Sequence, residues 1–369
     1  SLASVRFRVF DVRSGSELAG SHVWFGLRSE ILSLTRRGGE DHGGRAMRSA
    51  SRRLGECQRG GRSKMNTPDR SRVYQCHHFD STRWNYYSPR DDDIIIATSY
   101  KAGTTWTQGI VANLLFPDGG FPAPPAEMSP WIDMRFVPLE VFLNGIEAQE
   151  HRRYLKTHLP LDGMRYEPKV KYVYVSRDGR DVFMSLWNHY SNMTDESRTH
   201  MNNIPGRVGD PFPAAPDDIH EFWATWASQN WLEGEVGGWP YWSHLTNVQS
   251  WWNFKHLPNI EFFHYNDFLN DTEAEVKRLA DYLEITVPEE WWPRILKAIS
   301  FEDMKANADA YVPDGGSHWK GGAQTFMNKG TNGRWRDVLN REELAQYDSL
   351  CEEALTHDCR KWLESGRAA

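Results

Sequence analysis

Residues that could do chemistry gather in four short segments, and the segment 94–106 carries the clearest signal. An apolar run ends there near Lys101 and Gly103, and Thr104 and Thr105 follow where a helical pattern begins. A tight turn between a strand and a helix directs free backbone N–H groups and the positive helix end toward an anion. Lys101 adds a cation, and the two threonines add hydroxyl donors. The segment predicts a phosphate-binding loop, with a plain strand–turn–helix connection and a chance lysine as the alternative.

The spacing within this loop disfavours one large class of phosphate-binding proteins. Nucleoside triphosphatases carry the pattern GxxxxGK[ST], in which the lysine follows the last glycine. Here Lys101 precedes Gly103, and no glycine stands five residues before it. The pattern is therefore not that of an ordinary nucleotide kinase or ATPase.

Three further segments add cations, a histidine and a hydroxyl group. Lys156 and His158 stand at the end of a predicted strand, and Arg177 follows a strand rich in Val and Tyr. Ser185 lies one or two turns into the next helix, and residues 326–336 form a basic, Gly-rich loop. Ligands bind at the carboxyl ends of the strands in open α/β sheets. Two cationic sites and a histidine indicate a doubly phosphorylated nucleotide and a proton acceptor.

Together the four segments resemble the sulfotransferase family that uses 3′-phosphoadenosine 5′-phosphosulfate (PAPS), in its cytosolic branch and bacterial relatives. The resemblance spans roughly residues 86–339, with the motifs in the family's order. It implies a single α/β domain, a mostly parallel sheet flanked by helices and a P-loop-like strand–loop–helix. It also implies transfer of a sulfuryl group from PAPS to a hydroxyl of a small, lipophilic acceptor, without a metal, leaving 3′-phosphoadenosine 5′-phosphate (PAP).

The resemblance also implies a role for each matching residue. His158 corresponds to the general base, Lys101 to the group that stabilises the leaving phosphate oxygen, and Lys156 to a stabiliser of the transferring group. Arg177 and Ser185 correspond to the pair that binds the 3′-phosphate. The full set of positions implied to bind the donor is Lys101, Ala102, Gly103, Thr104, Thr105, Trp106, Arg177, Ser185, Tyr265, Phe301, Asn328, Lys329 and Gly330.

The chain departs from the family pattern in three places. Ala102 lacks the hydroxyl of the usual serine, and the usual proline before Lys101 is absent. Asn328 stands where the family usually has arginine, which leaves Arg334 or Arg336 to supply that 3′-phosphate contact. The dimer motif of animal members has no counterpart, so the oligomeric state stays open. Two alternatives are a P-loop phosphoryl-transfer enzyme and a catalytically inactive nucleotide-binding relative.

The acceptor site has no motif of its own. Candidates for its lining are the aromatic residues Trp131, Phe136 and Phe142, together with His189, for which a packed helix histidine is the alternative. A few of the clustered tryptophans could also line it, although an aromatic core is the favoured reading for most of them: Trp223, Trp226, Trp231, Trp239, Trp242, Trp251 and Trp252. We expect the Pro- and Gly-rich stretches 117–130, 194–216 and 308–324 to be loops that gate the pocket.

Strands and helices that alternate along the chain must position these residues. This alternation predicts a mostly parallel sheet covered on both faces by helices. The helix from Thr272 carries Glu275 three residues on, which is a capping-box pattern. The strands are expected at 94–97, 153–157, 171–176 and 260–265, and the helices at 103–116, 180–190, from Thr272 onward, and 342–363.

The first 64 residues differ in composition from the rest. They hold twelve Arg, one Lys and six acidic residues, a net charge of +7 in a chain whose total is −7. Six acids argue against a transit peptide, and no continuous apolar core indicates a secretory signal. We expect residues 1–64 to be a disordered or non-native extension, read in frame before a natural start at Met65, and residues 65–369 to form the sulfotransferase domain.

Composition bounds the remaining possibilities for the chain. The net charge argues against nucleic acid as a partner, and no run is apolar enough to cross a bilayer. The four cysteines have no CxxC spacing, which favours a reduced, cytoplasmic location. Cys351 and Cys359 fit core packing better than chemistry. Adjacent side chains rarely bind one ion, so we expect the pair His77 and His78 on the surface rather than at a metal.

Overall fold

The computed structural model describes residues 67–367, so the expectations for the block 1–64 lie outside the described residues. Its centre is a four-stranded parallel sheet in the order β2-β1-β3-β4, which confirms the predicted fold class. The strands are β1 (Ile94–Thr98), β2 (Tyr154–Thr157), β3 (Lys171–Ser176) and β4 (Ile260–His264). Each begins and ends within one residue of its predicted bounds. Because all four run in parallel, their carboxyl ends meet at one edge.

Side chains of the central strands alternate between two separate apolar cores. In β1, Ile94 and Ile96 pack on one face of the sheet, whereas Ile95 and Ala97 pack on the other. Such alternation is what the two-residue period of a strand requires when helices cover both faces. β1 lies between β2 and β3, with Thr98 beside Val175. This central place makes the carboxyl end of β1 the natural centre of a ligand site.

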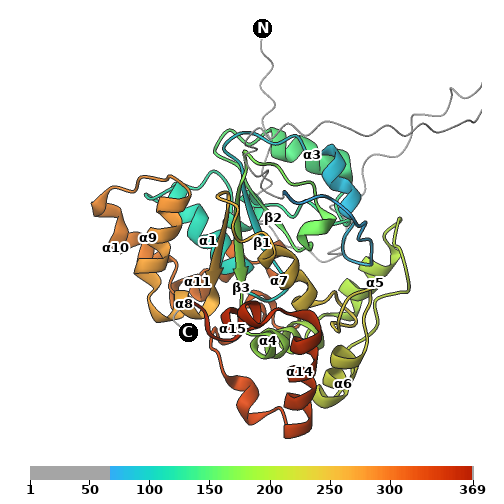
Figure 1. Cartoon of the computed structure of the whole chain (residues 1–369). Helices are drawn as coiled ribbons and strands as arrows, with labels where there is room; N and C mark the ends of the chain where they lie inside the picture. Colours follow the sequence, from blue (N-terminus) through green and yellow to red (C-terminus); the bar gives the residue numbers. More distant parts are fainter. Residues whose placement is uncertain (1–66, 368–369) are drawn as a thin grey trace, which may run out of the picture. The chain divides into compact units, whose positions relative to one another are not determined.

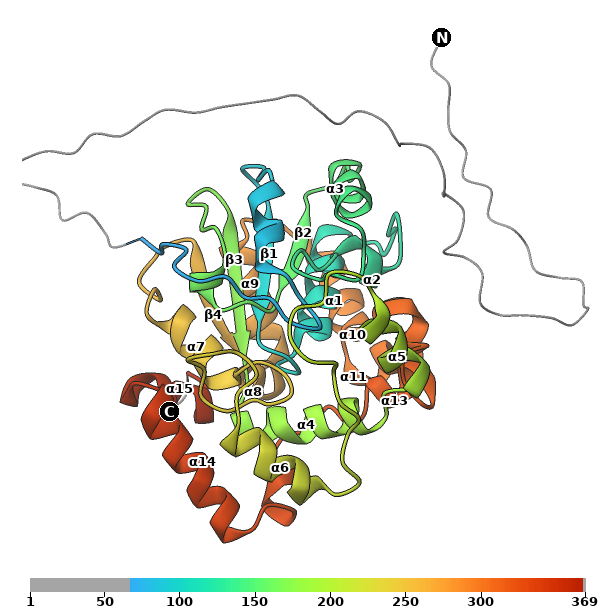
Figure 2. The ribbon, with the colours of Figure 1, turned by 90° about the vertical axis from the view of Figure 1, so that its right-hand side faces the viewer.

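Helices from different parts of the chain cover the two faces. The helices α1 (Thr104–Leu115), α9 (Thr272–Tyr282) and α10 (Trp292–Ala298) pack on one face, and α7 (His244–Trp252) packs on the other (Figure 1). Beyond one end of the strands lie α4 (Gly179–Ser191), α6 (Ile219–Ser228) and α14 (Arg341–Ala354) (Figure 2). The other α-helices are α2 (Pro125–Met128), α3 (Leu139–Glu147), α5 (Asp195–Asn203), α8 (Tyr265–Asn270), α11 (Phe301–Ala306), α12 (Ala308–Tyr311), α13 (Gly322–Phe326) and α15 (His357–Ser365).

Two predicted helices differ from those observed. The single helix expected over 342–363 is two helices, α14 and α15, because the backbone is extended at Leu355 and Thr356. The capping box expected at Thr272 is absent, since Asp271 is the N-cap and its side chain accepts from the Ala274 N–H. A capping box does occur at Asn340, whose side chain caps α14.

Other expectations are corrected by burial and by short helices. His77 and His78 are buried, not on the surface, because they pack among Phe212, Trp231 and Tyr241. The three stretches expected to be loops contain the short helices α2, α5, α12 and α13. Cys351 and Cys359 are fully buried, as core packing requires.

Candidate active site

The turn between β1 and α1 has the backbone that an anion cradle needs. Lys101 has φ 55° and Gly103 has φ 109°, both in the left-handed region. A Cβ on Gly103 would also lie 2.9 Å from the ring of Tyr265, so glycine is required for two reasons. Gly103 is the N-cap of α1 and provides no side-chain cap, which leaves first-turn N–H groups available to a ligand. Thr104 is buried, with its hydroxyl 2.7 Å from that of Thr98.

The His158 side chain is tied to the end of β1 through one of its ring nitrogens. Its Nδ1 lies 3.0 Å from the carbonyl oxygen of Thr98. A carbonyl only accepts, so Nδ1 carries the hydrogen and Nε2 is left with a free lone pair that can accept a proton. Burial, with the positive charges of Lys156 and Lys101, lowers the pKa of His158 to about 3. The ring is therefore neutral at physiological pH.

The Trp131 ring lies near two functional groups, Lys156 within β2 and His158 just after it. Its ring is edge-on to His158 at 4.7 Å between centroids, and the Lys156 ammonium lies 6.0 Å from its centre. Burial lowers the pKa of Lys156 to about 8. The structure thus places His158, Lys156 and an aromatic wall together, and of the acceptor candidates Trp131 and Trp242 both lie beside the histidine ring.

A buried carboxylate that the sequence analysis did not single out supports this group. Asp133 accepts from the hydroxyl of Thr157 at 2.7 Å, from Trp131 Nε1 at 2.5 Å and from the His158 backbone N–H at 3.3 Å. It therefore fixes two neighbours of His158 and the backbone of His158 itself. No local pattern in the sequence separates Asp133 from a surface acid, because its partners come from β2 and its own loop.

Lys101 lies against a different wall of the site. Its Nζ is 3.5 Å from Nδ1 of His189 and 4.0 Å from the centre of the Phe326 ring. Burial, with the nearby charges of Arg177 and Lys156, lowers the pKa of Lys101 to about 7. His189 therefore contacts the phosphate loop, whereas Phe142, another acceptor candidate, is buried beneath Arg83.

Arg177 extends from the end of β3 toward the late loop. Its Nε donates to Asn332 Oδ1 at 2.7 Å, and a terminal nitrogen donates to the carbonyl of Thr331 at 2.7 Å. Its guanidinium lies 4.3 Å from the centre of the Tyr265 ring. Arg177 thus joins the carboxyl edge of the sheet to the loop predicted to bind the 3′-phosphate.

Tyr265 connects the two ends of the predicted nucleotide site. Its hydroxyl donates to the carbonyl of Gly330 at 3.2 Å, and its ring lies 5.2 Å from that of Trp106. Trp106 Nε1 donates to the carbonyl of Ile299, which fixes the indole. A Cβ on Gly330 would lie 2.5 Å from the Phe301 ring, so the late loop approaches Phe301 closely.

The remaining predicted donor residues are placed less tightly. Ala102 is buried in the loop, Thr105 is half-buried in the first turn of α1, and Ser185 is half-buried on α4. The Lys329 side chain is exposed. The Asn328 carbonyl accepts from Lys305 Nζ at 2.7 Å, which anchors the backbone where the family usually has arginine.

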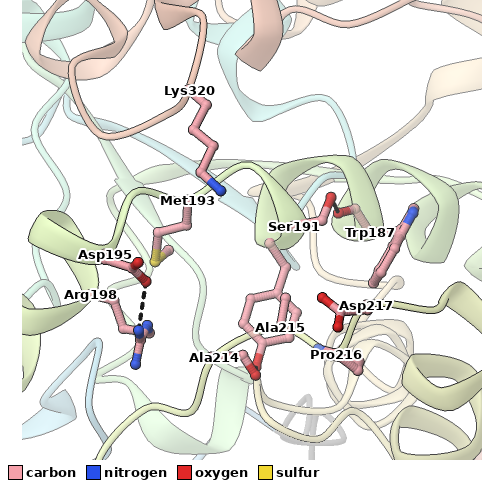
Figure 3. Close-up of a pocket in the computed structure, with 11 residues that line it drawn as sticks. Trp187, Ser191, Met193, Asp195, Arg198, Ala214, Ala215, Pro216, Asp217 and Lys320 are labelled. Carbon is pink, nitrogen blue, oxygen red and sulfur yellow. Dashed lines mark hydrogen bonds and ion pairs between the residues drawn. The ribbon is translucent and has the colours of Figure 1, made fainter.

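A surface cavity of about 290 Å³ lies apart from these residues. At 100° per residue, Trp187 and Ser191, which line it, face away from Ser185 and His189 on α4. Figure 3 shows Lys320 and the Asp195–Arg198 ion pair around its rim. The cavity is therefore no part of the catalytic group. Its lining residues are Trp187, Tyr190, Ser191, Met193, Asp195, Arg198, Ala214, Ala215, Pro216, Asp217 and Lys320.

Two absences among residues 67–367 bear on other functions. Within this range, no three or more His, Cys, Asp or Glu side chains lie together as a metal site. None of the helices described there combines the length and apolarity needed to span a bilayer.

The parallel sheet carries an anion cradle after β1, a neutral histidine beside that cradle and an arginine after β3. Together these features define an enzyme that transfers a group from a nucleotide. The chain belongs to the sulfotransferase family, because the family model for the sulfotransferase domain matches residues 91–358. It is an enzyme of the PAPS-dependent class, which confirms the predicted activity, transfer of a sulfuryl group to a hydroxyl acceptor.

The chain is also similar to individual sulfotransferases in sequence and to solved structures in fold. The chain is 29% identical to a glycolipid sulfotransferase of Mycobacterium bovis, over 80% of this chain and 94% of that protein. It is 27% identical to sulfotransferase 1A1 of Rattus norvegicus, over 73% of this chain and 86% of that protein. Among solved structures, retinol dehydratase with retinol and PAP has a TM-score of 0.57 at 23% identity. A mouse sulfotransferase with PAP has a TM-score of 0.57 at 22% identity, and each alignment covers 76% of this chain and 87% or 91% of the other.

Proposed function

We propose that His158 is the general base of sulfuryl transfer, and that Lys101 and Lys156 stabilise the charge that moves during the step. The observation that carries this proposal is the contact of His158 Nδ1 with the Thr98 carbonyl, which leaves Nε2 basic beside the phosphate loop. The acceptor oxygen forms a bond to sulfur as the bond from sulfur to the phosphate oxygen breaks. The acceptor proton goes to His158 Nε2, and the negative charge on the departing phosphate faces Lys101.

The donor would lie along the carboxyl edge of the sheet. Its 5′-phosphosulfate faces the loop from Lys101 to Thr105, and its 3′-phosphate faces Arg177. The adenine lies near Trp106 and Tyr265. The fit is supported by the glycine cradle at Gly103 and by the helix N-terminus without a side-chain cap. The cations of the site supply charge stabilisation by themselves, so we propose that the step needs no metal.

The acceptor is proposed to be a small, lipophilic alcohol, with a glycolipid hydroxyl as the first to test. Aromatic residues around His158 support this, because Trp131 and Trp242 both lie within 6 Å of its ring centre. The mycobacterial relatives named as glycolipid sulfotransferases supply the choice of glycolipid.

The test is a transfer assay with labelled PAPS and EDTA, run with a glycolipid, a long-chain alcohol and a phenol. We expect PAP and sulfated product to appear in equal amounts, and His158→Ala to be slower by about 10²- to 10⁴-fold. Transfer from ATP only with magnesium would favour the phosphoryl-transfer alternative. PAP binding without turnover on any acceptor would favour the inactive relative.

A further inference from the structure

Two arginines lie close together where β3 meets the late loop. Arg177 follows β3, and Arg334 is the first residue of the 3-10 helix η5 (Arg334–Asp337). Asp181 of α4 lies 4.0 Å from Arg177 and accepts at 2.7 Å from the N–H of Gly333, the residue before Arg334. The other nearby acid, Asp178, is occupied by a two-point ion pair with Arg180. One carboxylate thus balances two guanidinium groups, which leaves a net positive charge.

The Arg334 side chain has no hydrogen bond or ion pair among residues 67–367, and its Nε is buried without a partner. Burial and the positive charge of Arg177 lower the pKa of Arg334, while Asp181 and Tyr265 oppose this shift. A partly buried guanidinium near another cation is costly unless an anion compensates it. An unpartnered donor beside Arg177 therefore indicates a place for a bound anion.

The local backbone holds Arg334 where it is. Gly333 before it is tied to Asp181, and Trp335 after it lies under the Arg180 guanidinium at 4.1 Å. The Trp335 carbonyl also accepts from the Leu339 N–H at 2.8 Å. The short helix is thus anchored on both sides of Arg334.

Neither Asn328 nor Arg336 offers an unpartnered, partly buried guanidinium as Arg334 does. Asn328 carries no charge, and its carbonyl is occupied by Lys305. Arg336 is exposed, with its guanidinium 4.7 Å from the centre of the Trp335 ring. Of the two arginines that could replace a loop arginine, only Arg334 has a buried, unpartnered nitrogen and is affected by the charge of Arg177.

We propose that Arg334 is the second guanidinium of the 3′-phosphate site and supplies the contact that Asn328 cannot make. A phosphate monoester carries close to two negative charges and prefers paired guanidinium groups. Arg177 and Arg334 together outweigh the single charge of Asp181. The resulting positive charge favours binding of a phosphate group. This inference rests on the proposed donor site and names one residue that selects a 3′-phosphorylated nucleotide.

The test compares PAP with 5′-AMP, which lacks the 3′-phosphate, by calorimetry on the full chain. We expect Arg334→Ala to weaken PAP about 10-fold or more, because it removes a charged hydrogen-bonding partner, and to leave 5′-AMP within about twofold. Arg336→Ala is the matched control and should change neither affinity. Adding Asn328→Arg to Arg334→Ala should restore PAP binding. Arg334→Gln, which keeps the side-chain stem, replaces the alanine variant if thermal unfolding shows that the latter is not folded.

Equal loss of PAP and 5′-AMP affinity in the Arg334 variant would overturn the inference, since that result indicates a structural role. An unchanged ratio of the two affinities would overturn it as well. If the unaltered protein itself did not prefer PAP over 5′-AMP, the donor assignment would fail, and this inference with it. A preference that is present in the unaltered chain and retained in the variant would remove only the role of Arg334.

Discussion

The imidazole Nδ1 of His158 lies 3.0 Å from the carbonyl oxygen of Thr98, the last residue of β1. This contact ties the residue after β2 to the strand that leads into the phosphate loop. It sets the tautomer of the ring and its distance from the loop together. The carboxyl edge of the parallel sheet therefore positions base and anion cradle as one unit.

His158→Ala should reduce kcat by about 10²- to 10⁴-fold, which is the usual contribution of a positioned general base. PAP affinity should stay within about twofold, because the ring contacts Thr98 and Trp131 rather than the proposed phosphate sites. Steady-state kinetics and calorimetry on the same preparation check both parts. Turnover within threefold of the unaltered enzyme would remove His158 from the mechanism.

Donor binding should become weaker as pH rises above about 7. The pKa of Lys101 is about 7 in the ligand-free site, mainly because of burial, and a bound anion raises it. Above this pH the free enzyme must take up a proton to bind, so affinity falls by up to about tenfold per pH unit. Calorimetry in buffers of different ionisation enthalpy measures this proton uptake.

Lys101→Arg separates this effect from the titration of Lys156, whose pKa is about 8. A guanidinium stays charged throughout this range, so the step near pH 7 should disappear and any later step remain. Persistence of the lower step in the arginine variant would assign it to another group.

Asp133→Asn should reduce kcat by about 10- to 100-fold, since small displacements of a catalytic group are costly. The variant weakens the hydrogen bonds that hold Thr157, Trp131 and the His158 backbone. PAP affinity should not change. Thr157→Val, which removes one of these donors, is the control and should show a smaller loss. Activity equal to that of the unaltered enzyme would show that Asp133 does not position the base.

Asp93→Ala should destabilise the fold by about 3–5 kcal/mol without acting on the site. Asp93 and Arg153 form a fully buried ion pair at 2.6 Å, at the amino end of β1, opposite the ligand edge. Removing the carboxylate leaves a buried guanidinium without this partner. Denaturant unfolding measures the loss, and PAP affinity below the unfolding transition should be retained. A change under 1 kcal/mol would contradict this account.

The sheet was predictable because each strand is a short, strongly apolar or β-branched run. β3 was predicted with the correct bounds, since Val and Tyr alternate there without interruption. The break between α14 and α15 was not predictable, because the helical period continues through Leu355 and no Gly or Pro marks the turn. Tertiary contacts decide it, including the Thr356 N–H that donates to Gln249 Oε1.

The residues of the site likewise fall into those that local sequence predicts and those that it does not. The motif residues Lys101, His158 and Arg177 were found from local order along the chain, and their roles stay predictions until the variants above are measured. Asp133 acts through contacts between segments, so its local sequence carries no signal for it. The burial of His77 and His78 likewise depends on aromatic residues far along the chain.

The measurement that tests the central claim most directly is calorimetric binding of PAP in EDTA, against ATP with and without magnesium. The account predicts tight binding of PAP that is independent of metal, and much weaker binding of ATP under either condition. Weak binding of PAP, or a preference for ATP that requires magnesium, would contradict the proposed donor site at the carboxyl edge of the sheet.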